Sequence, residues 1–579
     1  MNKNNMRART QPLAPSHRWR LMVLQSLLVI AGLCIGYRVI DLQLLGQRFL
    51  QKEGEKRAVR YEKIPAHRGI IFDRSGRPLA VSTPVATIWA DPSDLLLSKQ
   101  RWGELAKQLN ISEDKLARRI KASQSKDFMY LKRHLPPTQE RKIMALSIPG
   151  VQVIDEHRRY YPAGEVTAHL VGFTNIDEQG QEGMELGYNK WLTGSPGEVR
   201  YLKDRRGHLV RQVELVDSAE PGKELKLSID LRLQYMAYRE LKKAVERHKA
   251  KAGSLVMIDV HTGEVLAMVN QPSYNPNNRS GMQAYRMRNR VITDALEPGS
   301  TLKPFTVIAA LESGRYKKDT LIDTSPGYMR VSGHRVSDIR NYGQLNVTSV
   351  LTKSSNVGVT KMALDLGVGK VLDVLRRVGI GQSIAVGFPG ENTGYLPFRD
   401  HWGGFEVATL SFGYGLTVTP LQLAQAYAVL GAKGIMRPIS LIKRDVVPEG
   451  VRVIDEKIAA DVLTMLETVV QSGSGKRAKV QAYEVGGKTG TVRKVGANGY
   501  SKSRHIGIFA GVAPIHNPRL ATVVVIDEPT DGKYYGGLTA APVFAKVNTS
   551  ALRILGVSPD PVNVLTADRP NNQDGKGAG

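Results

Sequence analysis

The N-terminal part of the chain carries one long apolar run. The run extends from Leu21 to Tyr37 and continues past Arg38 to Ile40. A helix of this length spans a bilayer if the Arg38 side chain reaches the far interface. We therefore predict a transmembrane anchor over residues 21–40.

The flanks of this run indicate its orientation. Residues 1–20 contain five basic residues and no acidic one, which predicts a cytoplasmic basic tail and puts everything beyond the anchor outside the cytoplasm. A cleaved signal peptide is the rival interpretation, but the run is long for such a peptide and Arg38–Asp41 lacks the small residues of a cleavage site. A buried core helix is the other alternative, and the clustered basic flank argues against it.

Turn-forming residues interrupt the pattern between residues 41 and 220. Loops are predicted at Arg74–Pro78 and Gly194–Gly197, and short β-like runs such as Gly69–Phe72 alternate with charged helical stretches. We find no catalytic constellation in this region. We predict that residues 41–220 form an elongated, non-catalytic α+β pedestal, which ends at a boundary in Ala219–Lys223.

A regular order of strands and helices follows over residues 221–557. The predicted elements are a strand at Leu225–Ile229, a helix at Leu231–His248, a hairpin of Gly253–Val260 and Val265–Val269, a long helical region, strands at Ile506–Val512 and Leu520–Ile526, and a helix from Ala540. Strands at both ends with helices between them imply one sheet built from the two ends of the domain. The fold class is therefore α/β, more narrowly α+β. The polar residues 558–579 are predicted to be a disordered tail.

The charge of the chain suggests a polyanionic neighbour. The net charge is +27, which fits an anionic bilayer, an acidic polymer, nucleic acid or a diffusely charged surface. No zinc-finger spacing, RNP-type aromatic signature or clean helix-turn-helix pattern occurs, so we do not expect nucleic acid as a partner. The single cysteine, Cys34, lies in the apolar run. An intramolecular disulfide is therefore impossible, and a cysteine nucleophile is not expected.

The first candidate for chemistry is the segment Glu297–Phe305. Pro298 and Gly299 break the chain directly before an apolar helical pattern, so Ser300 is predicted at a helix N-terminus, where developing negative charge is favoured. Lys303 follows one turn later on the same face. Burial against the serine would lower the pKa of its amine, which could then act as the base that a serine nucleophile needs. Taken alone, Ser-x-x-Lys also fits a helix cap beside a solvated lysine.

The second motif is Lys353–Gly358. Here Ser354 could relay a proton, and Asn356 could hydrogen-bond a substrate amide. Ser and Asn also favour helix caps, so a structural capping loop is the alternative.

The third motif is Gly486–Thr491. Thr489 and Thr491 share one face of a predicted strand, Gly490 would let the backbone approach a ligand closely, and Lys488 would supply a cation for a carboxylate. An exposed strand edge is the alternative interpretation.

The ordered set of three motifs resembles the penicillin-recognising serine enzymes, whose signatures are S-x-x-K, S-x-N or S-D-N, and K-[ST]-G. Other segments are similar to class B penicillin-binding proteins, and in particular to their septal members. These segments are Arg68–Arg74, Arg158–Pro162 and Gly183–Glu185 in the N-terminal module, and Tyr274–Asn277 and Ser411–Gly415 in the transpeptidase domain. The resemblance covers nearly the whole chain.

The resemblance implies a penicillin-binding transpeptidase fold, with an antiparallel sheet flanked by helices, and a peptidoglycan D,D-transpeptidase activity in septal cell-wall synthesis. Ser300 would attack the penultimate carbonyl of a D-Ala-D-Ala stem peptide, and Lys303 would take its proton. Backbone N–H groups of Ser300 and Thr491 would form the oxyanion hole. Such an enzyme is acylated covalently by β-lactams.

The same resemblance implies roles for the remaining motif residues. Ser354 would help protonate the departing D-alanine, with Asn356 beside it in the catalytic set. Lys488 would be catalytic and would also hold the terminal carboxylate. The other substrate-binding residues would be Thr489, Gly490 and Thr491.

The resemblance also implies the surroundings of the protein. We expect no cofactor and no metal. The expected partners are stem peptides, β-lactams, the membrane, and divisome proteins that include a septal glycosyltransferase. The expected location is the cytoplasmic (inner) membrane, with a single pass and a periplasmic catalytic domain.

Rival functions share some of these features. The elongation-type class B enzyme is nearest, and the landmarks favour the septal type. A serine β-lactamase-like hydrolase normally has neither an anchor nor so long an N-terminal module, and no base for its deacylating water can be assigned. A bifunctional class A enzyme would need room for a glycosyltransferase domain. An inactive scaffold does not require three intact motifs.

Overall fold

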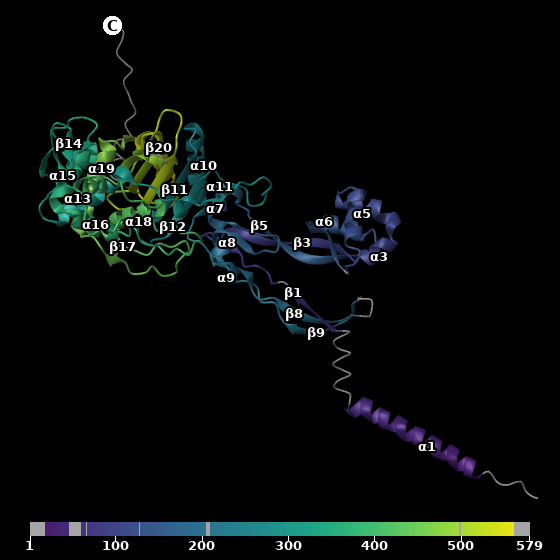
Figure 1. Ribbon diagram of the computed structural model, residues 1–579. Helices are drawn as coiled ribbons and strands as arrows, with labels where there is room; N and C mark the ends of the chain where they lie inside the picture. The colour runs from purple at the N-terminus through teal and green to yellow at the C-terminus, as the bar shows by residue number, and fades with distance from the viewer. Residues whose placement is uncertain are drawn as a thin grey trace, which may run out of the picture. The chain divides into compact units, whose positions relative to one another are not determined.

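The computed structural model describes residues 18–45, 59–64, 66–126, 128–203, 209–496 and 499–560. They fall into two compact units, one of residues 1–66 and 195–220 and the other of residues 67–194 and 221–579 (Figure 1). The predicted boundary near residue 220 coincides with the point where the chain leaves the smaller unit and enters the larger one. Most of the predicted pedestal nevertheless belongs to the larger unit. The domain boundaries themselves stay predictions.

The smaller unit contains the predicted anchor. Helix α1 (Arg18–Ile40) continues into a π-helical turn at Asp41–Leu45, and the stretch Trp19–Gln43 is long and apolar enough to cross a membrane. None of that stretch is buried against protein, so its apolar side chains need another environment to cover them. The helix fits a single-pass membrane anchor.

A small antiparallel sheet completes the smaller unit. Its strands lie in the order β1 (Val59–Ile64), β8 (Gly197–Lys203) and β9 (Leu209–Asp217). Glu62 pairs with Val199, so segments far apart in the sequence share this sheet.

The N-terminal part of the larger unit is built on a second sheet. Its strands are β10 (Leu225–Lys226), β2 (Ile71–Phe72), β3 (Pro78–Ala90) and β4 (Met129–Leu135) in that order, with β5 (Val151–Tyr160) also paired to β3. Helices cover one end of it: α3 (Pro92–Leu97), α4 (Trp102–Leu109), α5 (Glu113–Ala122) and α6 (Pro137–Met144). Apolar side chains such as Ile88, Leu105 and Leu116 form a separate core there.

Three sequence landmarks meet in a buried ion triad. Glu185, in α8 (Gly183–Gly187), accepts from Arg68 at 2.6 Å and from Arg159 at 2.6 Å. The three side chains are at most 2% exposed. Arg159 also donates to the Gly69 carbonyl at 2.8 Å. The landmarks in the N-terminal module are therefore structural: they tie the segment before β2 to β5 and α8.

The main sheet of the larger unit combines both ends of its chain, as predicted. Its antiparallel strands lie in the order β12 (Val265–Gln271), β11 (Ala252–Asp259), β21 (Leu520–Asp527), β20 (Gly499–Ala513) and β19 (Gly486–Gly496). The predicted hairpin is the pair β11–β12, and Val256 of β11 pairs with Val523 of β21. Strand β19 is left at the edge of the sheet.

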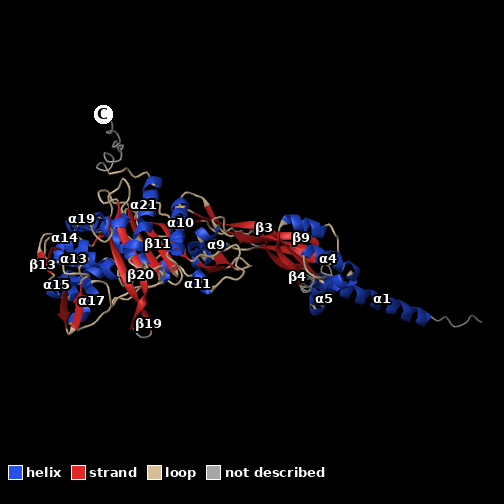
Figure 2. Ribbon diagram, turned by 90° about the horizontal axis from the view of Figure 1, so that it is seen from above, coloured by secondary structure: helices blue, strands red, loops and turns tan. Residues whose placement is uncertain are grey.

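Helices cover both faces of this sheet (Figure 2). Leu255 and Met257 of β11 face a core formed with α10 (Leu231–Arg247) and α21 (Ala541–Ile554). Val256 and Ile258 face the opposite core. The helices of that second core include α13 (Lys303–Glu312), α14 (Val347–Lys353), α15 (Asn356–Leu366), α16 (Val368–Arg377), α18 (Pro420–Gly431) and α19 (Glu456–Gln471).

Two predicted elements differ from the structure in detail. The strand predicted at Leu225–Ile229 is limited to Leu225–Lys226, because Asp230 already accepts from the Arg232 amide and caps α10. In the predicted disordered tail, Asp560 is described: its carboxylate accepts from the Glu484 amide. Residues 561–579 lie outside the described part.

Candidate active site

Ser300 lies on a tight turn that leads into α13. The 3-10 turn η4 spans Gly299–Leu302, and the α-helix begins directly afterwards at Lys303. Gly299 has a φ of +55°, which a residue with a side chain adopts only with strain. Ser300 therefore stands one turn before the helix proper, near the N-terminus predicted from the sequence.

The segment Ser411–Gly415 holds this turn in place. It follows α17 (Gly404–Ser411), and the Gly299 amide donates to the Gly413 carbonyl at 3.0 Å. A Cβ atom on Gly413 would lie 2.1 Å from the Gly299 carbonyl oxygen, so only glycine fits there. On the helix side, the Tyr427 hydroxyl donates to the Thr301 carbonyl at 2.8 Å.

The second motif forms a corner between two helices. Helix α14 ends at Lys353, Ser354 adopts a left-handed conformation with φ 59°, and α15 begins at Asn356. The Ser355 hydroxyl accepts from the Gly358 amide and caps α15. The motif therefore forms the helix-capping loop that the alternative interpretation predicted. The same loop turns Ser354 and Asn356 toward α13.

Asp338 anchors this corner, although it lies outside the three sequence motifs. Its carboxylate accepts from the Ser355 hydroxyl at 2.5 Å and from the amides of Asn356 and Val357 at 2.5 and 3.0 Å. These bonds stabilise a helix N-terminus, where a carboxylate is favoured. Asp338 directly follows β15 (His334–Ser337), and no local sequence signal links it to a helix that begins at residue 356.

Lys303 is completely buried and reaches the second motif. Its Nζ donates to the Ser354 carbonyl at 2.6 Å, to Ser354 Oγ at 3.1 Å and to Asn356 Oδ1 at 2.7 Å. The structure thus pairs it with Ser354 and Asn356, and the expected contact with Ser300 is not among the hydrogen bonds of the described residues. Burial lowers the pKa of Lys303 well below its usual value. The neighbouring cation of Lys488 lowers that pKa further, whereas Asp338 raises it.

Lys488 approaches the same hydroxyl from the sheet. It extends from the edge strand β19, and its Nζ donates to Ser354 Oγ at 2.9 Å and to the Thr489 carbonyl at 3.2 Å. The side chain is fully buried, and burial lowers the pKa of Lys488 to about 7. We predicted an available cation for a carboxylate. The structure buries this amine and joins it to Lys303 through the Ser354 hydroxyl; its contact with a carboxylate stays a prediction.

The remaining residues of the third motif line the edge of β19. Thr489 Oγ1 lies 2.7 Å from the hydroxyl of Ser474, and Thr491 Oγ1 accepts from the Gly536 amide at 3.1 Å. A Cβ atom on Gly490 would lie 3.0 Å from both the Pro298 carbonyl oxygen and Thr301 Cγ2. Gly490 therefore lets the strand pack against the Ser300 turn, and its predicted close approach to a ligand stays a prediction.

Glu297 and Tyr500 also belong to the surroundings of the turn and were missed. Glu297 Oε1 accepts from the Tyr500 hydroxyl at 2.8 Å and from the Gly415 amide at 3.0 Å. This contact joins β20 to the segment that holds the Ser300 turn. In the sequence, only the position of Glu297, three residues before Ser300, indicated that either residue belongs to the site.

The assembled site has the parts that acyl transfer requires. The Ser300 hydroxyl lies on the turn that leads into α13. The buried amines of Lys303 and Lys488 have lowered pKa values, and the Ser354 hydroxyl lies between them. A neutral amine can accept a proton, and a hydroxyl held between two amines can pass one on. Among the described residues, no group of three or more His, Cys, Asp and Glu side chains is arranged to hold a metal ion.

Two family models match the chain in the regions that this architecture defines. The penicillin binding protein transpeptidase domain matches residues 253–549, and the penicillin-binding protein dimerisation domain matches residues 63–227. The chain belongs to the class B penicillin-binding proteins.

Individual relatives agree with this assignment. The chain is 45% identical over 567 residues to the peptidoglycan D,D-transpeptidase FtsI of Escherichia coli K12, covering 97% of this chain and 96% of the relative. It is 42% identical to the probable peptidoglycan D,D-transpeptidase PbpC of Pseudomonas aeruginosa, covering 94% and 96%. Among solved structures, penicillin-binding protein 3 of Mycobacterium tuberculosis with aztreonam matches with a TM-score of 0.68 and 26% identity, covering 86% of this chain and 98% of that one.

Proposed function

We propose that this protein is a peptidoglycan D,D-transpeptidase that cross-links stem peptides through a serine acyl-enzyme during septal cell-wall synthesis. Membership of the class B penicillin-binding proteins supports the reaction class, and the similarity to proteins named FtsI supports the septal role. β-lactams are then covalent inhibitors, as the solved complex of a structural neighbour with aztreonam suggests.

The observation that carries the proposal is the hydroxyl of Ser354 held between the amines of Lys303 and Lys488, at 3.1 and 2.9 Å, beside the Ser300 turn. Two buried lysines on one hydroxyl are costly for stability alone, because each must lose its charge or its hydration. A proton-transfer role gives a reason for the cost.

In the first half-reaction, Ser300 Oγ attacks the penultimate carbonyl carbon of a D-Ala-D-Ala end while Lys303 takes the hydroxyl proton. The carbonyl oxygen becomes an oxyanion, which backbone N–H groups of Ser300 and Thr491 stabilise; one such donor contributes roughly a hundred- to a thousandfold in rate. The intermediate breaks the peptide bond, and the departing D-alanine amine receives a proton through Ser354. Lys488, Thr489 and Thr491 hold the substrate carboxylate.

In the second half-reaction, an amine of a neighbouring stem peptide attacks the ester carbonyl of the acyl-enzyme. An amide bond forms and the ester bond breaks. The attacking amine gives up a proton to Lys303, and Lys303 returns it to Ser300 Oγ. The reaction exchanges one amide for another, so no oxidant or external energy source is required.

The test of the nucleophile is covalent labelling of membranes with a fluorescent penicillin, followed by peptide mapping. We expect one adduct, on Ser300, and its loss in the variant Ser300→Ala. The exposed Ser280 offers a matched control, and Ser280→Ala should label like the wild type. Label that persists in Ser300→Ala would refute the assignment.

The septal role and the divisome partners require a test in cells. Depletion of the protein should give filaments that elongate without dividing, and the wild type, but not Ser300→Ala, should restore division. Swollen or rounded cells instead of filaments would favour the elongation-type alternative.

A further inference from the structure

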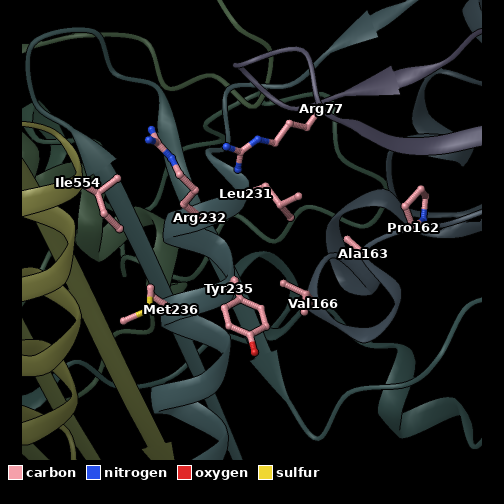
Figure 3. A pocket seen from close by; sticks show the side chains of 9 residues that line it. All are labelled: Arg77, Pro162, Ala163, Val166, Leu231, Arg232, Tyr235, Met236 and Ile554. Carbon is pink, nitrogen blue, oxygen red and sulfur yellow. The ribbon is translucent and has the colours of Figure 1, made fainter.

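A groove on the surface of the larger unit lies apart from the catalytic residues. Its volume is about 560 Å³. The residues that line it are Arg77, Pro162, Ala163, Val166, Leu231, Arg232, Tyr235, Met236 and Ile554 (Figure 3). The floor is mainly apolar, yet Tyr235 is 53% exposed.

The two helices that line the groove pack on the opposite face of the main sheet from the helix that follows Ser300. Leu231, Tyr235 and Met236 belong to α10, and Ile554 ends α21. Both helices pack on the sheet face that carries Leu255. Helix α13, which follows Ser300, packs on the opposite face. Substitutions in the groove can therefore be separated from the catalytic machinery.

Buried polar contacts hold the walls of the groove in a fixed arrangement. Asp73, fully buried, accepts from the Arg77 amide at 2.8 Å and from the Leu231 amide at 3.1 Å, which ties the β2–β3 turn to the start of α10. Gln234, also buried, donates to the Val166 carbonyl at 2.9 Å. Hydrogen bonds thus fix both opposing walls to α10, so a ligand would meet a preformed site.

One end of the groove carries two arginines. Figure 3 shows the guanidinium groups of Arg77 and Arg232 at the same end, with the Tyr235 ring at the other. Asp230 neutralises Arg232 at 2.6 Å, whereas Arg77 has no side-chain partner in the described part of the chain. Asp73, the other carboxylate at this end, accepts from the backbone amides of Arg77 and Leu231. The exposed cation therefore favours an acidic occupant.

We propose that this groove docks a segment of a partner protein in which large aliphatic or aromatic side chains are flanked by a carboxylate. The apolar side chains would cover Leu231, Met236 and Ile554, and the carboxylate would pair with Arg77. Burial of apolar side chains in a preformed groove supplies the affinity, and the charge pair sets the orientation of the segment. An apolar segment without acidic residues leaves Arg77 unpaired, and an acidic segment without apolar residues leaves the floor exposed.

The test uses the full chain in nanodiscs of neutral lipid and a fluorescent synthetic helix of leucine and glutamate, with binding measured by anisotropy. We expect Met236→Glu and Arg77→Glu each to weaken binding at least tenfold. Arg330→Glu makes the same charge change at an exposed arginine on β14 (Tyr328–Val331) and should leave binding within twofold. Acylation by a fluorescent penicillin should be unchanged in all three variants, which shows that they remain folded.

Several outcomes would overturn the proposal. Equal binding to all variants, or equal binding of a helix with serine in place of leucine, would mean attraction to the net positive charge of +27 alone. Binding that appears only after removal of residues 561–579 would make the chain's own C-terminus the occupant. Self-association that Met236→Glu abolishes would make a second copy the occupant.

A photo-crosslinking residue in place of Tyr235, in cells, tests the source of the segment. A cross-link mapped by mass spectrometry to an apolar, acid-flanked segment of another protein supports the proposal. A cross-link confined to lipid or to this chain contradicts it.

Discussion

The Ser354 hydroxyl links the two buried lysines of the site. It accepts from Lys303 and Lys488, so the charge of each amine affects the proton affinity of the other. The cation of Lys488 lowers the pKa of Lys303, and the anion of Asp338 raises it. If neutral Lys303 is the base, acylation must slow as the pH falls through its pKa. We call this fall of the acylation rate at low pH the acidic limb. Lys488 and Asp338 should shift the acidic limb in opposite directions.

Lys488→Gln removes the cation that lowers the pKa of Lys303. That pKa rises, and the acidic limb of the acylation rate should move to higher pH. The rate itself should fall about a hundredfold, at the lower end of the effect of a positioned proton-transfer group. The measurement is the second-order acylation rate constant with one β-lactam as a function of pH. The exposed Lys479→Gln is the control. A limb that stays in place or moves to lower pH would show that the lysines are not coupled as inferred.

Asp338→Asn should have the opposite effect on the same profile. The anion that raises the pKa of Lys303 is lost, so the acidic limb should move to lower pH. The rate should fall about tenfold, because hydrogen bonds from Ser355 and the Asn356 amide to a charged group are weakened. Asp338 is a positioning residue, and a purely structural role would lower the rate without moving the limb.

At the scale of elements, the site lies where the edge strand β19 meets two helix starts. The Ser300 turn leads into α13, and the corner at Ser354 leads into α15. Close packing fixes their spacing, since Gly413 has no room for a side chain and a Cβ atom on Gly490 would be tightly placed. The arrangement is therefore as rigid as the sheet and helices that carry it, which is what a preorganised site requires.

The N-terminal module depends on the triad in a comparable way. Replacing Glu185 with Gln leaves Arg68 and Arg159 buried without a full counter-charge, a change that typically costs about 3–5 kcal/mol of unfolding free energy. We expect urea unfolding of the larger unit to shift to lower concentration accordingly. Glu182→Gln is the matched control, because Glu182 is only partly buried and forms no ion pair among the described residues. Equal unfolding of the two variants would mean that the triad contributes no stability.

At the scale of the whole molecule, the anchor and the catalytic part are joined in one chain. The sequence predicts that the end before α1 stays in the cytoplasm, because its flank is basic. A reporter fused after Gly579 should be active if it works only in the periplasm and inactive if it works only in the cytoplasm. The reverse pattern would refute the single pass with this orientation.

Removal of residues 1–44 should separate anchoring from chemistry. All three motifs lie in the larger unit, which has its own cores, so the shortened chain should be soluble and should be acylated like the wild type. In cells we expect it to fail to support division, because the proposed partners act at the membrane. Full rescue of division would show that the anchor is dispensable.

The sequence by itself determined the features that depend on local pattern. The apolar run gave α1, alternating and helical periodicity gave the β11–β12 hairpin and α10, and spacing gave the three motifs. Each of these depends on residues close together in the chain, whose side-chain period is fixed by backbone geometry. Three landmarks of the N-terminal module were also found from sequence, but their purpose was not.

Only the tertiary structure decided which distant residues meet. It brought Arg68, Arg159 and Glu185 into one triad and put Asp338 at the start of α15. It also buried Lys488, predicted as an available cation, so that its pKa falls to about 7. Burial and pairing arise from contacts between segments that are far apart in the chain. No local period encodes those contacts, and the pKa values that make the site reactive depend on them.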